Sequence, residues 1–345
     1  MNRQPKLLGL DIGFGFTKCV DGERTIIFPS SLRRGLPSPG SAGRPAEGGF
    51  DIAVEDGDYR VGDDTDSPSF LENFARRPER LFDTFGKHLI LTAIAAFSEQ
   101  ECPLHLVIGL PLSLTRQWEA PLTEGLRGYH KIGIYQPDGR SVRKNIHIRR
   151  VRVVPHPLGT FATLIMNVRG YLQASPYREN KIVLVDIGFR TTDVMVMTAA
   201  RFGNRGSGTI EMGIADGIEA IAAKLGQTMS PPPDLRRLLK AIHRGFIRIE
   251  GQEYNLRPLR DTTYRWLAAA LGDRINAFLR EDWDLESVLL TGGGAADLAE
   301  DLAPLIKGEV VLIEHHRDPR LSNADGQLRL ARHHWGATGF CGNTP

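Results

Sequence analysis

Two stretches of the chain share one pattern of apolar and polar positions. In the first, the apolar run Leu7–Leu10 reaches Asp11, a turn with two glycines follows, and a second apolar strand begins at Phe16. The same order returns in 182–196, where an apolar run ends at Asp186. Apolar runs on either side of a polar turn are typical of a β-hairpin. We therefore predict two equivalent hairpins, each with an aspartate at the end of its first strand.

A third stretch follows a different pattern. The apolar run Val288–Leu290 leads through Thr291 into Gly292, Gly293 and Gly294, and a helical segment starts at Ala295. Glycines leave the backbone bare, so a flat ligand can lie directly against it. A single Asp-x-Gly turn is equally compatible with an ordinary tight hairpin. Two such hairpins followed by a strand, three glycines and a helix form a much more specific combination.

The hairpin turns have the composition of a phosphate-binding site. Glycine allows backbone N–H groups to face an anion, hydroxyls add donors, and lysine adds a positive charge. We expect the aspartates, Asp11 and Asp186, to hold Mg²⁺ through water, because this ion keeps much of its hydration shell. The predicted phosphate-binding residues are Gly13, Phe14, Gly15, Phe16, Thr17, Lys18, Gly188, Phe189, Arg190, Thr191, Thr192 and Asp193.

This order of motifs resembles the actin, sugar kinase and Hsp70 ATPase superfamily, and within it the bacterial actin-like proteins of the plasmid-segregation ParM type. The resemblance implies an α/β, actin-like ATPase fold, with two RNase H-like domains, small inserted subdomains and a nucleotide cleft between the domains. It makes residues 11–18 and 186–193 the two phosphate loops, and Gly292 to Gly294 the adenosine loop. The expected ligands are ATP or ADP with Mg²⁺, and GTP is the alternative.

Chain length and the resemblance both indicate two domains, since 345 residues exceed what one hydrophobic core usually serves. We expect domain I to span 1–175, with a small subdomain at about 30–100, and to be completed by 323–345. Domain II would span 176–322, with a small subdomain at about 228–260. Predicted helices cover 79–97, 155–172, 213–225, 258–281, 295–305 and 323–340; predicted strands outside the hairpins include 25–29, 104–111, 132–135, 144–154 and 310–313. An exposed hairpin is predicted at 50–54 and 59–62.

One position departs from the family pattern. ParM-like proteins have a glutamate directly after the Val-x-Pro strand end, where this chain has His156. A neutral imidazole, with an ordinary pKa of about 6.5, can accept a proton from an attacking water. Alternatively, His156 only satisfies a backbone group at a helix start, and turnover is slow or absent. Asp216 and Lys224 are candidates for nucleoside contact, or they are solvated charges of a helix.

The amino-acid composition limits the kinds of partner that we expect the protein to bind. The net charge of +2, from 43 basic and 41 acidic residues, argues against nucleic acid or an anionic membrane as the main partner. Three distant cysteines show neither a disulfide framework nor zinc spacing. No apolar run approaches the roughly 18 residues of a membrane-spanning helix, and a signal peptide is not expected. We expect a cytoplasmic protein without a membrane anchor.

The same ATP cleft serves several functions in this superfamily, so the cleft alone does not decide between them. We expect a filament-forming cytoskeletal protein whose nucleotide-dependent polymerisation, coupled to ATP hydrolysis, moves or positions cargo such as plasmid DNA. It would associate with itself and with a DNA-bound or cargo adaptor protein. The alternatives are a non-polymerising adaptor of the same fold and a small-molecule kinase of the superfamily.

Overall fold

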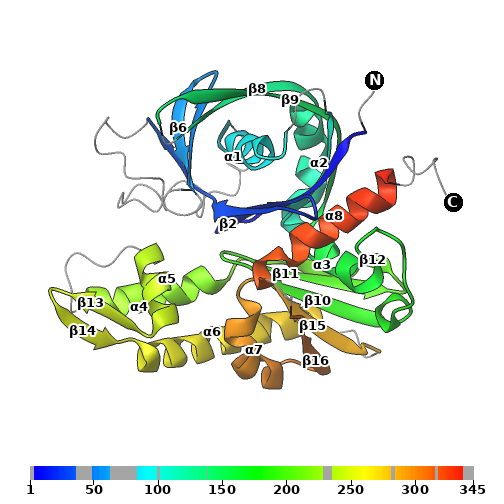
Figure 1. The fold of residues 1–345 in the computed structure, drawn as a ribbon. Helices are drawn as coiled ribbons and strands as arrows, with labels where there is room; N and C mark the ends of the chain where they lie inside the picture. The colour runs from blue at the N-terminus through cyan, green and yellow to red at the C-terminus, as the bar shows by residue number, and fades with distance from the viewer. Residues whose placement is uncertain are drawn as a thin grey trace. The chain divides into compact units, whose positions relative to one another are not determined.

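The chain forms two compact units in a computed structural model, which describes residues 4–35, 49–62, 84–98, 102–136, 138–227, 235–280, 284–314 and 318–336 (Figure 1). Unit 1 comprises Met1–Arg178 together with Arg320–Pro345. Unit 2 comprises Glu179–Pro319. Each unit is built around its own sheet.

Within its described residues, unit 1 has one sheet of nine strands in the order β3-β2-β1-β7-β9-β8-β5-β6-β4. β1, β2 and β3 are antiparallel neighbours, whereas β1, β7 and β9 run parallel. The strands are β1 (Lys6–Ile12), β2 (Phe16–Val20), β3 (Thr25–Pro29), β4 (Leu32–Arg34), β5 (Phe50–Val54), β6 (Gly57–Val61), β7 (Leu104–Leu110), β8 (Gly128–Tyr135) and β9 (Ser141–Pro155). The helices are α1 (Thr84–Ala95), α2 (Leu112–Leu126), α3 (His156–Ile165) and α8 (Ser322–Trp335), with 3₁₀ turns η3 (Pro176–Arg178) and η5 (Pro319–Leu321).

Unit 2 repeats this strand arrangement. Its five-stranded sheet has the order β12-β11-β10-β15-β16, with β10 to β12 antiparallel and β10, β15 and β16 parallel. They are β10 (Lys181–Ile187), β11 (Thr192–Thr198), β12 (Arg201–Ile210), β15 (Ser287–Thr291) and β16 (Glu309–Leu312). β13 (Phe246–Ile249) and β14 (Gln252–Asn255) form a separate hairpin. The helices are α4 (Ile214–Gly226), α5 (Leu235–Arg244), α6 (Arg257–Phe278) and α7 (Ala295–Leu302), followed by η4 (Ala303–Leu305).

Both predicted hairpins are confirmed, and each provides the first two strands, in chain order, of the sheet of its unit. In β1 and β2, Asp11 is the cross-strand partner of Lys18. In β10 and β11, Asp186 is the partner of Asp193. The glycine triplet between β15 and α7 is confirmed as well. The aspartates of both units therefore occupy equivalent positions, at the carboxyl end of the first strand.

The alternation of side chains along β1 gives this strand two different environments. Leu8, Leu10 and Ile12 are buried in a core that also contains the apolar side of α1, and Figure 1 shows the strands curving around this helix. The odd-numbered positions belong to the opposite face, where Gly9 lies against α8. Asp11 is on this second face, because side chains alternate along a strand.

Backbone contact fixes α8 to the rest of unit 1. A Cβ atom on Gly9 would lie 2.1 Å from the carbonyl oxygen of Ala324, and one on Gly326 would lie 1.6 Å from that of Gly159. Neither position has room for a side chain. The Asn323 carboxamide oxygen also accepts a hydrogen bond from the Thr160 hydroxyl at 2.9 Å. The helix is therefore held against both β1 and α3.

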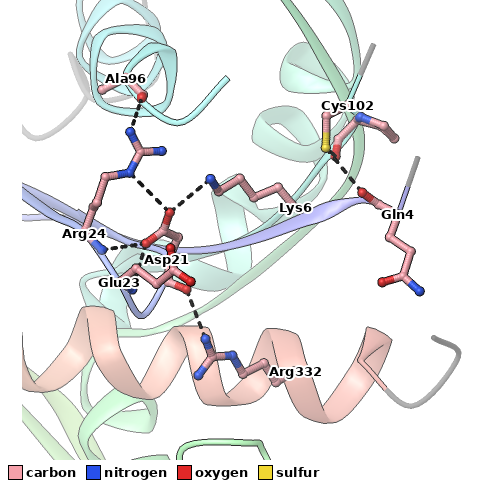
Figure 2. A network of polar contacts seen from close by, with 9 residues as sticks. Gln4, Lys6, Asp21, Glu23, Arg24, Ala96, Cys102 and Arg332 are labelled. Carbon is pink, nitrogen blue, oxygen red and sulfur yellow. Dashed lines mark hydrogen bonds and ion pairs between the residues drawn. The ribbon is translucent and has the colours of Figure 1, made fainter. Parts of the chain in front are cut away.

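A polar network ties the far end of α8 to the turn between β2 and β3 (Figure 2). The Asp21 carboxylate accepts the backbone N–H groups of Glu23 and Arg24 at 2.9 and 2.7 Å and pairs with Lys6 at 3.1 Å. Arg332 of α8 donates to the Asp21 carbonyl oxygen at 3.0 Å. Burial alone would raise the pKa of Asp21, but these hydrogen bonds and charges lower it.

The core of unit 2 lies between its sheet and helices α4 to α7. Val183, Val185 and Ile187 of β10 contribute one face of the strand to this core. Helix α6 contributes Leu267, Leu271 and Ile275, which recur at helical spacing and are fully buried. This face positions α4 and α7 at the carboxyl end of β10.

Two predictions about individual elements are wrong in part. The hairpin of β5 and β6 is not exposed as predicted. Ile52 and Val61 are fully buried, and β5 pairs with β8 of the main sheet. α3 ends at Ile165, earlier than expected, and leaves Val168 and Leu172 exposed. The predictions missed α2 and β14.

Several predicted segments lie outside the described residues. These are most of the loop 33–49, the first turn of the helix at 79–97, the start of the small subdomain at 228–234, and the C-terminal residues 337–345 with Phe340. No helix among the described residues has the length and apolar character needed to cross a membrane.

The Gly326–Gly159 contact can be tested by Gly326→Ala. We expect a loss of unfolding free energy of about 1–3 kcal/mol, because the added methyl group forces α8 away from α3. Urea denaturation of the purified protein measures this loss. Gly125→Ala in α2 is the matched control, since a Cβ there meets no described atom within 4 Å. It should leave stability unchanged or raise it by up to about 1 kcal/mol, and equal losses for both variants would contradict the contact.

Candidate functional site

The turn between β1 and β2 is stabilised by Ser30, the residue directly after β3. Gly13 N–H donates to the carbonyl oxygen of Phe16 at 3.0 Å, which closes the turn. Ser30 donates its hydroxyl to the Gly13 carbonyl oxygen at 2.6 Å and its N–H to that of Gly15 at 3.0 Å. The Thr17 hydroxyl lies 2.9 Å from the Ser30 hydroxyl and is fully buried. Thr17 therefore stabilises the turn, through a partner that the sequence analysis did not identify.

Asp11 is almost completely buried, with 2% of its surface exposed. Its Oδ2 atom accepts a hydrogen bond from Lys18 Nζ at 2.7 Å, and its Oδ1 atom lies 2.9 Å from Nε2 of His156. Burial alone would raise the pKa of Asp11, because water no longer stabilises the charge. Lys18 and His156 outweigh this effect and hold the pKa well below its usual range. Asp11 is therefore ionised at neutral pH.

The contact between His156 and Asp11 follows from the parallel strands. Asp11 is paired with Gly109 of β7, and the next residue of β7 is paired with Pro155 of β9. The carboxyl ends of three strands thus meet at one edge of the sheet. His156 is the first residue of α3, directly after Pro155. The sequence analysis identified His156 but not its partner.

In unit 2, the turn between β10 and β11 is docked on the start of α4. Gly188 N–H donates to the Thr191 carbonyl oxygen at 2.9 Å and closes the turn. The N–H groups of Ile214 and Ala215 donate to the carbonyl oxygens of Gly188 and Phe189 at 3.2 and 2.8 Å. The first N–H groups of α4 are therefore used inside the unit.

The glycine triplet lies against this same turn. Gly292 has a φ of +93°, and a Cβ there would lie 2.2 Å from Oδ1 of Asp186. Gly294 donates its N–H to the Ile187 carbonyl oxygen at 2.9 Å, and a Cβ there would lie 2.4 Å from the Ile214 side chain. The structure thus brings together the hairpin turn, the start of α4 and the glycine loop.

The other predicted phosphate-loop residues have mainly internal contacts. The Thr192 hydroxyl is buried and donates to the Met212 carbonyl oxygen at 2.9 Å. Asp193 accepts a hydrogen bond from the Thr209 hydroxyl at 2.6 Å. Phe14 belongs to the core of unit 1, and Phe189 packs against the core of unit 2. These side chains anchor the turns.

Arg190 is held by an acid that the sequence analysis missed. Its Nη2 atom lies 2.7 Å from Oε1 of Glu219 on α4, and its guanidinium lies over the Phe189 ring at 5.7 Å. Arg190 thus places a positive charge beside the turn, with Glu219 as its counter-ion.

The two candidate nucleoside residues are separated along α4. The Asp216 carboxylate accepts the N–H of Gly213 at 2.9 Å and so caps the helix. Lys224 is exposed and lies eight residues further on, about 12 Å along the helix axis. The structure therefore does not bring these two residues together, and Asp216 has a structural partner.

Two groups of candidate residues result, one in each unit. Unit 1 gathers Asp11, Lys18 and His156 around the first turn. Unit 2 gathers Asp186 and the glycine loop around the second turn. Two family models match these same halves: residues 9–159 match the N-terminal domain of actin-like proteins, and residues 184–304 match the C-terminal domain of the archaeal actin homologue MreB-like proteins. The chain belongs to the actin-like proteins.

Solved structures of other actin-like proteins share the fold. The archaeal actin homologue Ta0583 matches with a TM-score of 0.78 and 21% identity over 95% of this chain and 99% of that chain. Its complex with ADP matches with a TM-score of 0.75 and 20% identity, over 94% and 98%. A 15-stranded ParM filament from Clostridium botulinum matches with a TM-score of 0.77 and 20% identity, over 96% and 99%. No curated protein sequence matches the chain.

The resemblance and the fold class predicted from the sequence are thereby confirmed for this actin-like protein. The roles of individual residues in binding nucleotide or metal stay predictions.

Gly292→Ala tests the glycine loop of the actin-like protein. We expect a loss of unfolding free energy at least about 1 kcal/mol larger than for Gly251→Ala, measured by urea denaturation. Both glycines have a positive φ, +93° and +83°, but a Cβ on Gly251 meets no described atom within 4 Å. The control thus carries the backbone strain without the contact to Asp186. Equal losses would show that Asp186 does not constrain the loop.

Proposed function

We propose that this actin-like protein binds Mg²⁺-ATP and forms filaments whose nucleotide-dependent assembly moves or positions cargo such as plasmid DNA. The observation that carries the proposal is the duplicated hairpin, with an aspartate at equivalent positions in both units and a glycine loop against the second. ADP would remain after hydrolysis, and GTP is the alternative nucleotide. The protein would act in the cytoplasm.

The phosphates would contact the bare backbone of the two turns and the cations beside them. Gly13 and Gly15 place no side chain on the first turn, and Nζ of Lys18 would lie 3.0 Å from a Cβ atom on Gly13. Gly188 and Arg190 provide the corresponding groups in the second turn. Backbone N–H groups near a cation are a common phosphate-binding arrangement. The bare backbone at Gly292 and Gly294 would accommodate the nucleoside.

Asp11 and Asp186 are the residues that would hold Mg²⁺ through water. The chemistry of the donors fits, because Asp11 is ionised and carboxylate oxygens are ligands of the kind that Mg²⁺ prefers. When bound, the ion supplies charge neutralisation at the phosphates. Asp11 and Asp186 would orient its water ligands.

His156 would accept a proton from the water that attacks the nucleotide. The ionised carboxylate of Asp11, 2.9 Å from Nε2, favours a proton on that nitrogen and holds the ring in place. This is the tautomer logic of an aspartate–histidine pair in other hydrolytic sites. The alternative, a purely structural role at the start of α3, predicts no effect on turnover.

Filament formation is supported by the structural neighbours. One is described as a 15-stranded ParM filament, and another as a non-polymerisable quadruple mutant of pCBH ParM. Actin-like subunits would associate head to tail, which extends into a fibre when the rotation does not close a ring. An adaptor protein on DNA or on other cargo would then connect the filament to its load.

Asp186→Ala and His156→Ala test the site. With Asp186→Ala, we expect Mg²⁺-dependent phosphate release from ATP to be lost. With His156→Ala, we expect release to fall at least about tenfold while ATP affinity changes little, because a general base acts on the chemical step. Calorimetry measures affinity and a phosphate assay measures release. His147→Ala, in β9 and stacked on Tyr129, is the control. Wild-type rates for His156→Ala would remove His156 from the chemistry.

Assembly is tested by sedimentation with ATP, ADP or no nucleotide, followed by electron microscopy of the pellets. We expect filaments with ATP and fewer with ADP, because hydrolysis would loosen the contacts between subunits. ATP binding without any pellet would instead favour the non-polymerising adaptor or a small-molecule kinase. Absence of nucleotide binding would contradict all three functions.

A further inference from the structure

Gln327 on α8 is a buried amide without an evident role. None of its surface is exposed, and among the described residues neither Nε2 nor Oε1 has a hydrogen-bond partner. Buried polar groups in folded proteins are nearly always paired, with protein atoms or with ordered water. Glutamine is also rarely buried completely. Both facts indicate that a further group completes this site.

The Gln327 amide lies against Gly109 of β7. A Cβ atom built on Gly109 would lie 2.0 Å from Nε2 of Gln327 and 2.8 Å from Cδ2 of His156. The amide and the imidazole ring therefore flank the same bare piece of backbone. Gly109 is also the strand partner of Asp11. Gln327 is thus a direct neighbour of the Asp11–His156 pair.

The packing of α3 on α8 keeps these groups in register. Asn323 of α8 bonds to Thr160 of α3, and Gln327 and His156 each lie one turn away along their helices, at four residues from this pair. The contact between Gly326 and Gly159 lies between them. Two helices joined by direct backbone contact cannot slide past each other without breaking it. The amide is therefore fixed relative to the ring.

Asp11 supplies a further oxygen for the same site. Oδ1 of Asp11 lies 2.9 Å from Nε2 of His156, and because a carboxylate oxygen has two lone pairs, Oδ1 retains acceptor capacity. The Gln327 amide lies against Gly109, and Asp11 is the strand partner of Gly109, so Oδ1 of Asp11 and the two polar atoms of the amide belong to the same region of this face of the sheet. A buried water typically has two to four such partners.

We propose that Gln327 is a positioning residue, whose amide binds one ordered water against Oδ1 of Asp11 and so fixes the carboxylate and the His156 ring. Its effect on catalysis rests on the proposed ATP hydrolysis. The water itself is structural and does not react. The site would explain why the Gln327 side chain is completely buried on α8.

Gln327→Met is the decisive variant, because methionine has a similar length and no hydrogen-bonding amide. If the amide were only an unpaired buried group, its removal would leave stability unchanged or raise it, with no effect on His156. If it positions the pair, phosphate release should fall at least about fivefold, while ATP affinity stays within about twofold of wild type. Gln327→Leu is the second variant, should the methionine variant fold poorly.

Two readouts do not depend on ATP. The ring ¹⁵N chemical shifts of His156 should change in Gln327→Met and stay unchanged in the control Leu328→Met, whose side chain lies in a separate apolar cluster with Val20 and Leu321. A high-resolution crystal structure of the wild type should show the water over Gly109. If the wild type does not hydrolyse ATP, the proposed function fails while these readouts still decide the site. Unchanged shifts together with no ordered water would overturn the inference.

Discussion

A buried carboxylate at the end of β1 constrains much of unit 1. Taking an ionised group out of water costs several kcal/mol unless partners compensate for it. For Asp11, these partners come from two parts of the sequence: Lys18 across the hairpin and His156 at the start of α3. The hairpin register and the strand order must both be correct before Asp11 can be buried in its charged form. The burial of this one side chain thus depends both on the local hairpin and on segments that are distant in the sequence.

Unit 2 also buries an aspartate, Asp186, but surrounds it with different groups. Asp186 is 7% exposed, and its surroundings are shaped by the glycine loop rather than by a lysine on the paired strand, where Asp193 stands instead. Asp193 is in turn bonded to Thr209 of β12. The two units therefore share a backbone plan but not a charge arrangement. Unit 1 pairs its carboxylate with Lys18 and His156, whereas unit 2 places its cation, Arg190, against Glu219.

The elements predicted correctly from the sequence are those with a local signal. Both hairpins and the strand before the glycines alternate or run continuously in apolar residues, and α6 and α8 have helical periodicity. By contrast, α2 contains Pro121 and a glycine near its end and buries few side chains, and β14 is exposed at every position. Ser30, Glu219 and Gln327 gave no signal at all. Their roles come from contacts between distant segments, which a single sequence does not reveal.

The contacts of the turn residues in the structure change how the two turns would bind a nucleotide. Thr17 and Thr192 look like ligand donors in the sequence, but both hydroxyls are buried and stabilise their own turns. The remaining donors are backbone N–H groups and the two cations. Lys18 is already compensated by Asp11, and Arg190 by Glu219. We therefore expect a bare triphosphate, with its full negative charge, to bind less well than the same nucleotide neutralised by Mg²⁺. The dependence on magnesium would then arise from these ion pairs as much as from the metal ligands themselves.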